Sequence, residues 1–268
     1  MSTTEVPQKT QVKFQKLIED ANEAGIEYVI KRSFQLLPNK IYGDDIDVFV
    51  QDDHIVDFVD LALDRGFQYR TRDLSERSST FLDYIRRSVA RPQNAIQVLT
   101  DKQRRQSHIQ KLLKNEEEKK LNRNKEARKV ITVEHNGIDI QFENQLFHSS
   151  LFSDSNYRVH PHIEKEMLSS RRMHENGFYI PSPPDELLHL ICRGVLDYHH
   201  RGDSTWPEYY KNRCDDLVVT IQESKEHNTR FRDLLPYVFF EADQLVLDIV
   251  FEQRYEDIRP ELVSYAGY

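Results

Sequence analysis

The chain has 268 residues, of which 38% are hydrophobic and 31% are charged, and its formal net charge is −8. This composition predicts a soluble globular protein with one large or two modest domains, and the negative balance excludes a basic surface over the whole chain for nucleic acid. No segment approaches the roughly 20 apolar residues that a membrane-spanning helix needs, and residues 1–10 lack the apolar core of a signal peptide. We therefore expect a cytoplasmic protein without a membrane span.

Residues 1–70 alternate between helical and strand patterns. The polar residues 1–9 predict a loose tail, and the apolar residues that follow at helical spacing predict a helix that Gly25 ends. Asp45 to Val50 alternates between polar and apolar residues, which is typical of a half-buried strand. The predicted helices cover residues 11–24 and about 53–63, and the predicted strands cover residues 26–30, 45–50 and 67–69.

Residues 102–129 are rich in Lys and Arg, with acidic residues at 116–118. After a weak strand pattern at 95–99, we expect a long charged helix over 102–125, as part of an insertion at about 101–129. Its basic side chains could meet RNA, DNA or an anionic membrane, or could form a solvated helix whose charges partly cancel. The absence of aromatic residues argues against stacking on single-stranded nucleic acid.

A β-hairpin and a run of helices are predicted after this segment. Apolar residues alternate on both sides of Asn136-Gly137, a dipeptide typical of tight turns, so strands are expected at 130–133 and 138–142. Ser182-Pro183-Pro184-Asp185 marks a helix start, with a capping Ser, an early Pro and an acid in the first turn. Further helices are expected at about 207–224, 230–241 and 242–255. The fold class is therefore α+β, with a mixed α and β front half and a helical back half.

Three Asp residues lie on predicted strands where they could form one site. Alternation places Asp45 and Asp47 on one strand face, about 7 Å apart along the strand, and Asp44 on the other face. Asp139 lies on the polar face of the hairpin's second strand and can join them if the two strands are neighbours. Converging carboxylates repel each other unless a cation lies between them, and their oxygens suit Mg²⁺. The alternative is that these residues only form the solvent face of a half-covered sheet.

The motifs around these residues resemble those of a known family. The stretch from Tyr28 to Ser33 (YVIKRS) and the later GDDIDVFV resemble the polymerase-β-like nucleotidyltransferase superfamily, more narrowly its members associated with surface-polysaccharide genes. That family has an apolar strand, a small-residue turn, D-x-D on the next strand, and a third Asp on a later strand, where Asp139 fits. The resemblance implies a nucleotidyltransferase catalytic domain at residues 10–150, with a small mixed β-sheet flanked by helices, and a helical domain at residues 151–268.

The resemblance also implies an activity. It predicts a metal-dependent nucleotidyltransferase that moves a nucleoside monophosphate from a nucleoside triphosphate, ATP among the candidates, to a small polar or sugar-related acceptor, with release of pyrophosphate. Asp45 and Asp47 would bind Mg²⁺ or Mn²⁺, and Asp139 would bind the catalytic metal and help to deprotonate the acceptor. Ser33 would contact the β- or γ-phosphate, with Arg32 beside it.

Arg32 departs from the family pattern, which has a glycine in its place. The guanidinium could reach the phosphates as a charged fork, or it could close the loop to a nucleotide. Two rival hypotheses therefore stay open. One is a catalytically inactive member of the same fold that binds a nucleotide or a partner, and the other is an RNA-acting nucleotidyltransferase that uses the basic segment.

The remaining candidates lie in the helical half. Two basic residues are candidate nucleotide contacts: Lys211 and Arg213. Four aromatic residues could line an acceptor pocket or could pack between helices: Tyr198, Trp206, Tyr209 and Tyr210. Histidines without a ligand cluster at metal spacing are expected on the surface: His160, His162, His199 and His200. His189 is either an interior or an acceptor-site residue, and Cys192 is expected as a buried thiol.

Overall fold

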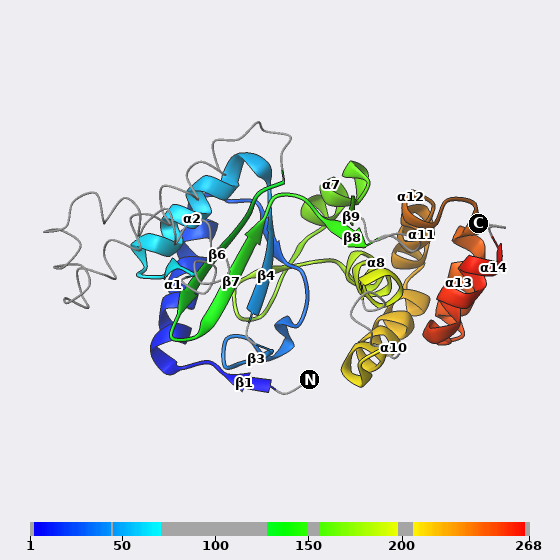
Figure 1. Ribbon diagram of the computed structural model, residues 1–268, viewed down its shortest axis with the longest axis horizontal. Coiled ribbons are helices and arrows are strands. Elements are labelled where there is room, and N and C mark those ends of the chain that lie inside the picture. The colour runs from blue at the N-terminus through cyan, green and yellow to red at the C-terminus, as the bar shows by residue number, and fades with distance from the viewer. Residues whose placement is uncertain (1–2, 44, 71–127, 150–155, 198–205, 266–268) are drawn as a thin grey trace, which may run out of the picture.

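The computed structural model of the chain describes residues 3–43, 45–70, 128–149, 156–197 and 206–265. It has an α+β fold, in which a mixed sheet with its helices is followed by a helical C-terminal region (Figure 1). The expected strand at 95–99, the charged helix at 102–125, Asp44, Tyr198, His199 and His200 lie outside the described residues.

The central sheet contains the strands that carry the candidate carboxylates. Among the described residues it has five strands, of which β4 and β7 are parallel neighbours and the other adjacent pairs are antiparallel. The hairpin of β6 and β7 turns at Asn136 and Gly137, whose φ angles of 54° and 82° are those of the tight turn that this dipeptide favours. In spatial order, the strands are β2 (Tyr28–Ile30), β4 (Asp45–Val50), β7 (Ile138–Glu143), β6 (Val130–His135) and β5 (Gln68–Tyr69).

The two faces of this sheet differ in what covers them. Helices α1 (Gln8–Glu23) and α2 (Ile55–Asp64) pack on one face, where the apolar residues of β4 and β7 form the main core with them. On the opposite face, Val29 and Phe49 belong to a smaller hydrophobic cluster, to which α7 (Pro161–Ser169) contributes Met167. Because side chains alternate along a strand, the acidic residues of β4 and β7 belong to this second face.

Two short segments differ from the expected boundaries. Inside the expected tail, β1 (Thr3–Glu5) pairs with β3 (Lys40–Tyr42), which is a correction to the loose tail. After residue 150, Phe178 and Ile180 return to the main core of the sheet. The other short elements are η1 (Phe34–Leu36), η2 (Asp52–His54), β8 (Phe147–Ser149), β9 (Asn156–Arg158), β10 (Arg172–Met173) and β11 (Tyr179–Ile180).

The C-terminal helices enclose a second hydrophobic core. It contains Trp206, stacked on Tyr255 with ring centroids 5.4 Å apart, and the buried thiols of Cys192 and Cys214, so the expectation for Cys192 is confirmed. None of the helices in the described parts of the chain is long and apolar enough to cross a membrane. The elements are α8 (Pro183–Cys192), η3 (Arg193–Asp197), α10 (Glu208–Glu223), α11 (Lys225–Leu234), α12 (Pro236–Phe239), η4 (Phe240–Ala242), α13 (Asp243–Phe251), η5 (Tyr255–Asp257) and α14 (Ile258–Tyr265).

The start of α8 contains a buried charge network rather than the expected cap. The Ser182 side chain makes no capping hydrogen bond to the helix and instead donates to the Asp185 carboxylate, whose side chain is 0% exposed. Arg230 of α11 lies 3.0 Å from Asp185 and donates to Glu166 at 2.8 Å and to Ser170 at 2.9 Å. This arginine therefore links three segments, α7 with its C-terminal end, α8 and α11.

Candidate functional site

The parallel pairing of β4 and β7 places the three expected Asp residues on one face of the sheet, at the same end of two neighbouring strands. Asp45 is the direct partner of Asp139, and Asp47 is the partner of Gln141, so all of these side chains share the face opposite α1 and α2. Asp47 is 6% exposed and Asp139 is 1% exposed, whereas Asp45 is half-buried. Two buried carboxylates and one accessible carboxylate thus lie at the same end of neighbouring strands.

The antiparallel strand β2 delivers the expected phosphate-contacting residues to this end. Ile30 pairs with Val48, so the residues that follow β2 reach the beginning of β4, where the Lys31 amide donates to the Asp47 carbonyl at 3.0 Å. Arg32 Nη2 forms an ion pair with Asp47 Oδ2, and Arg32 Nη1 donates to the Tyr210 hydroxyl of α10 at 2.8 Å. Arg32 therefore connects the sheet to the C-terminal helices.

Two further ion pairs surround the carboxylates. Arg70, just after β5, places Nη1 3.2 Å from Asp139 Oδ2. The Lys31 ammonium pairs with Glu143 of β7, and both side chains are only 5% exposed. Local sequence identifies neither pair, because in the sheet β6 separates β5 from β7 and β4 separates β2 from β7.

Buried carboxylates need compensating charge, and these arginines supply it. Burial by itself raises the pKa of Asp47, but the nearby charges of Arg32, Lys31 and Arg193 outweigh burial and hold that pKa well below its usual range. Within the described ranges, no three His, Cys, Asp or Glu side chains are grouped closely enough to hold a metal ion. Carboxylate oxygens are the ligands that Mg²⁺ prefers, but each buried Asp already has a guanidinium as its cationic partner, so a divalent cation would have to displace or share these ion pairs.

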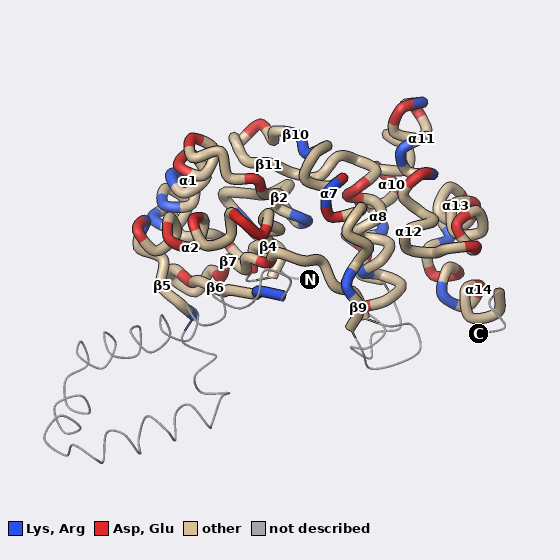
Figure 2. Tube along the Cα trace, turned by 90° about the horizontal axis from the view of Figure 1, so that it is seen from above, with Lys and Arg blue, Asp and Glu red and all other residues tan. Residues whose placement is uncertain are grey.

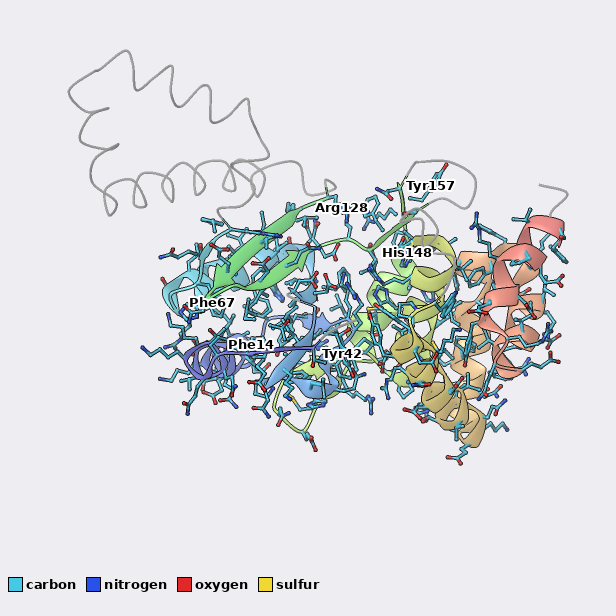
Figure 3. All side chains as sticks on the ribbon, turned by 60° about the horizontal axis from the view of Figure 1, so that its bottom comes forward. Phe14, Tyr42, Phe67, Arg128, His148 and Tyr157 are labelled. Atoms are coloured by element: carbon cyan, nitrogen blue, oxygen red, sulfur yellow. The ribbon has the colours of Figure 1, made fainter. Side chains whose placement is uncertain are left out.

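A cavity of about 240 Å³ lies between the sheet region and the helices α8 and α10. Ser33, which directly precedes η1 and has a φ of 59°, lines it from the sheet side together with Tyr42. Tyr42 stacks on Tyr209 of α10 with ring centroids 4.9 Å apart and planes 12° apart. Figure 3 shows Tyr42 at this boundary between the sheet and the C-terminal helices. Because Ser33 directly follows Arg32 in the chain, the cavity lies next to the residue that forms the ion pair with Asp47.

The floor of the cavity contains a buried ion pair. Glu186 of α8 is 1% exposed and accepts two hydrogen bonds from Arg213, at 2.7 Å from Nε and 2.6 Å from Nη2. Burial raises the pKa of Glu186, although Arg213 acts in the opposite direction. Arg213, a candidate nucleotide contact, therefore lies beside the cavity with its guanidinium engaged by a carboxylate.

Other expected residues lie elsewhere. Lys211 of α10 pairs with Glu256 of η5 at 2.6 Å and is not among the described residues that line the cavity. His160 caps α7 by accepting from the His162 amide, and both rings contact Tyr237. Trp206 packs within the helical core, as the packing interpretation expects.

His189 on α8 is buried close to the site. Neither ring nitrogen has a hydrogen-bond partner among the described residues, and its ring centroid is 5.6 Å from that of His148. Burial lowers the pKa of His189 well below its ordinary value, and the charges of Lys31 and Arg193 act in the same direction. The imidazole is therefore neutral at physiological pH.

Most of the basic segment lies outside the described residues. Only its last residues are described, where Lys129 donates to Asp52 at 2.8 Å and Arg128 lies 3.4 Å from Glu143 and above the Phe147 ring. These contacts stabilise the sheet region. In Figure 2, acidic and basic residues are interspersed along α1, α2 and the C-terminal helices.

Some cavity residues were missed by sequence reasoning although a signal exists. Asn212 and Asp216 were not singled out, yet they share helical spacing with the candidates Tyr209 and Arg213 on α10, and all four line the cavity. Tyr42 carries no such signal, because its stacking partner lies far along the chain.

The resemblance to nucleotidyltransferases rests on the residues of this chain alone. Comparisons with protein-family models, with curated proteins and with solved structures find no significant match.

Proposed function

We propose that this protein is a metal-dependent nucleotidyltransferase that moves a nucleoside monophosphate from a nucleoside triphosphate to a small polar acceptor. The observation that carries the proposal is the register of β4 and β7, which sets Asp45 opposite Asp139, with Asp47 on the same face. The turn after β2 supports it, because it brings Arg32 and Ser33 to the same end of the sheet.

The residues take complementary roles in this reaction. Asp45, Asp47 and Asp139 would hold Mg²⁺ or Mn²⁺, which when bound supplies positive charge to the phosphates. The Ser33 hydroxyl would donate to a terminal phosphate oxygen, and the Arg32 guanidinium would pair with phosphate charge. The acceptor hydroxyl attacks the α-phosphorus, the bond to pyrophosphate breaks, and the Asp139 carboxylate takes the hydroxyl proton.

Several observations favour a small acceptor over a long nucleic acid. The cavity of about 240 Å³ beside Ser33 is below the size of sites for drug-sized ligands, roughly 300–1,000 Å³. The net charge of −8 disfavours a polynucleotide partner, and acidic and basic residues are interspersed along the described elements that Figure 2 shows.

The ion pairs of the arginines favour one rival. Arg32 with Asp47 and Arg70 with Asp139 already compensate both buried carboxylates. A protein that no longer binds metal would keep such pairs, so a catalytically inactive member that binds a nucleotide or a partner is the second candidate function.

Calorimetric titration separates these possibilities. ATP, GTP, CTP and UTP are titrated into the wild-type chain with and without Mg²⁺, and into Asp45→Asn/Asp47→Asn. The control Asp57→Asn/Asp64→Asn changes the charge equally at exposed positions of α2, which covers the opposite face of the sheet. We expect Mg²⁺-dependent binding by the wild type and the control, and its loss in the site variant.

The outcomes assign the function. If no triphosphate binds to the wild type, the nucleotidyltransferase proposal fails. If a triphosphate binds without Mg²⁺ and no pyrophosphate is released with any acceptor of a panel of sugars, amines and RNA, the inactive nucleotide-binding function replaces it. Circular dichroism of each variant verifies that the fold is retained.

A further inference from the structure

The guanidinium of Arg32 is held at the carboxylate end of the sheet by contacts on two sides. Its Nη2 atom pairs with Asp47 Oδ2, and its Nη1 atom donates to the Tyr210 hydroxyl at 2.8 Å. The Arg32 side chain is 12% exposed and that of Asp47 is 7% exposed, so little water screens this ion pair. Arg32 is therefore a fixed cation directly on one of the three carboxylates that would hold a metal ion.

The other buried carboxylates of this face have basic partners as well. Arg70 Nη1 lies 3.2 Å from Asp139 Oδ2, and the Lys31 ammonium pairs with Glu143. Like charges repel at short range, so a divalent cation that approaches Asp47 or Asp139 meets a guanidinium already at the carboxylate. The two arginines thus oppose the binding of a cation to the carboxylates that they compensate.

Arg32 differs from Arg70 because it also adjoins the expected phosphate position. Ser33 follows it directly and lines the cavity, and the Lys31 amide, which donates to the Asp47 carbonyl at 3.0 Å, anchors the backbone before this turn. A guanidinium accepts a phosphate in place of a carboxylate, because both offer two oxygens to its fork. Arg32 can therefore exchange Asp47 for a phosphate through its side-chain torsions, without a movement of β2.

We propose that Arg32 is a blocker of the cation site that a polyphosphate removes. Without a polyphosphate, the guanidinium holds Asp47 and lowers the affinity of this carboxylate for a divalent cation. A polyphosphate beside Ser33 draws the guanidinium away from Asp47, so the anion and the cation bind cooperatively. The inference rests on the proposed function for the identity of the anion, whereas the competition between Arg32 and a cation for Asp47 follows from the ion pair alone.

Electron paramagnetic resonance of free Mn²⁺ measures this competition on the full chain, without any nucleotide. Arg32→Gln removes the charge of the blocker, and we expect Mn²⁺ to bind about tenfold more tightly than to the wild type. The gain should disappear in Arg32→Gln/Asp47→Asn, which lacks the carboxylate as well. The matched control is Arg65→Gln, which breaks an ion pair with Asp20 on the side of the sheet that α1 and α2 cover, and it should keep the wild-type affinity.

Binding of inorganic tripolyphosphate in the absence of metal ions measures the exchange of partners. Asp47→Asn releases the guanidinium, so this variant should bind tripolyphosphate about tenfold more tightly than the wild type. The loss of a negative charge by itself also favours an anion, and a double-mutant cycle with Arg32→Gln separates the two effects, because the gain through Arg32 should be absent in that background. ATP in the same assay identifies the source of the anion, since tighter binding of ATP than of tripolyphosphate assigns it to a nucleotide.

Tyr210→Phe keeps the inference testable if circular dichroism shows that Arg32→Gln does not fold. It removes only the hydroxyl that orients the guanidinium, and Mn²⁺ should bind severalfold more tightly to it than to the wild type. Equal Mn²⁺ affinities of the wild type and the variant that folds overturn the inference, even if triphosphates bind with Mg²⁺. Tighter Mn²⁺ binding by Arg32→Gln, with no triphosphate bound by the wild type, keeps the blocker and removes the transferase.

Discussion

Replacing Arg230 with Met tests whether the buried charge network holds the C-terminal region to α7. Arg230 is the cation that lies 3.0 Å from Asp185, and the Asp185 side chain is 0% exposed. Removing one partner of a buried pair costs about 3–5 kcal/mol, because the other charge stays buried without compensation. The Arg230 side chain is 23% exposed, and Ser170 and Ser182 still donate to Asp185, so the lower end of about 3 kcal/mol applies.

Urea unfolding followed by the fluorescence of Trp206 measures this loss, because the only tryptophan of the chain lies in the helical core. In thermal unfolding, a loss of about 3 kcal/mol corresponds to a decrease in Tm of about 6–12 °C for a domain of this size. Arg232→Met, which removes an exposed arginine two positions along α11, is the matched control and should have a much smaller effect.

A second substitution identifies the cause of the loss. Arg230→Met/Asp185→Asn should recover part of the stability, because a neutral amide needs no compensating cation. Equal urea midpoints for Arg230→Met and Arg232→Met would refute the reasoning, since they would mean that the Asp185 carboxylate is neutral or solvated.

Three further predictions follow from single positions. Burial raises the pKa of Asp197, but the hydrogen bond with His148 and nearby charges outweigh burial and lower this pKa from 3.8 to about 2. Asp197 therefore contributes about 2 kcal/mol to the free energy of unfolding. This contribution is present above pH 4 and is lost as the pH falls to 2. The stability difference between wild type and Asp197→Asn in urea should narrow over that range, and a constant difference would exclude this role. Gly137→Ala should lower the free energy of unfolding by about 1 kcal/mol, because Gly137 has a φ of 82°, which alanine adopts only with strain. An added Cβ meets no atom within 4 Å, so no steric clash adds to this loss. An unchanged urea midpoint would show that the turn relaxes. His189→Leu should raise the free energy of unfolding by about 1 kcal/mol, since it removes a buried imidazole that has no hydrogen-bond partner among the described residues. A lower Tm would reveal a partner such as bound water.

The strands of the site could be predicted because their signals are local. Alternation marks Asp45 to Val50, and Asn136-Gly137 marks the hairpin that carries Asp139. The structure confirms both and adds the parallel pairing that places Asp45 opposite Asp139. That pairing depends on how the two segments pack on α1 and α2, which no local pattern encodes.

The partners of the carboxylates could not be predicted in the same way. Arg70 reaches Asp139 across β6, so its role follows from sheet order and not from spacing. The strand of Thr3 to Glu5 has no apolar alternation that would mark it, and within the described part of the chain it pairs with β3 alone. The Ser182 side chain matches a capping motif, but its hydroxyl donates to the buried Asp185 carboxylate and its oxygen accepts no capping hydrogen bond.

The position of Arg32 has a consequence for how the two regions communicate. Its guanidinium holds a carboxylate of the sheet with one nitrogen and a tyrosine of α10 with the other. Any cation that binds Asp47 competes with this guanidinium, and its affinity is reduced by the strength of the ion pair. A cation that displaced the guanidinium from Asp47 would break one of the two contacts by which Arg32 joins β4 to α10. A single side chain, Arg32, is therefore shared between the carboxylate end of the sheet and the docking of the helical region.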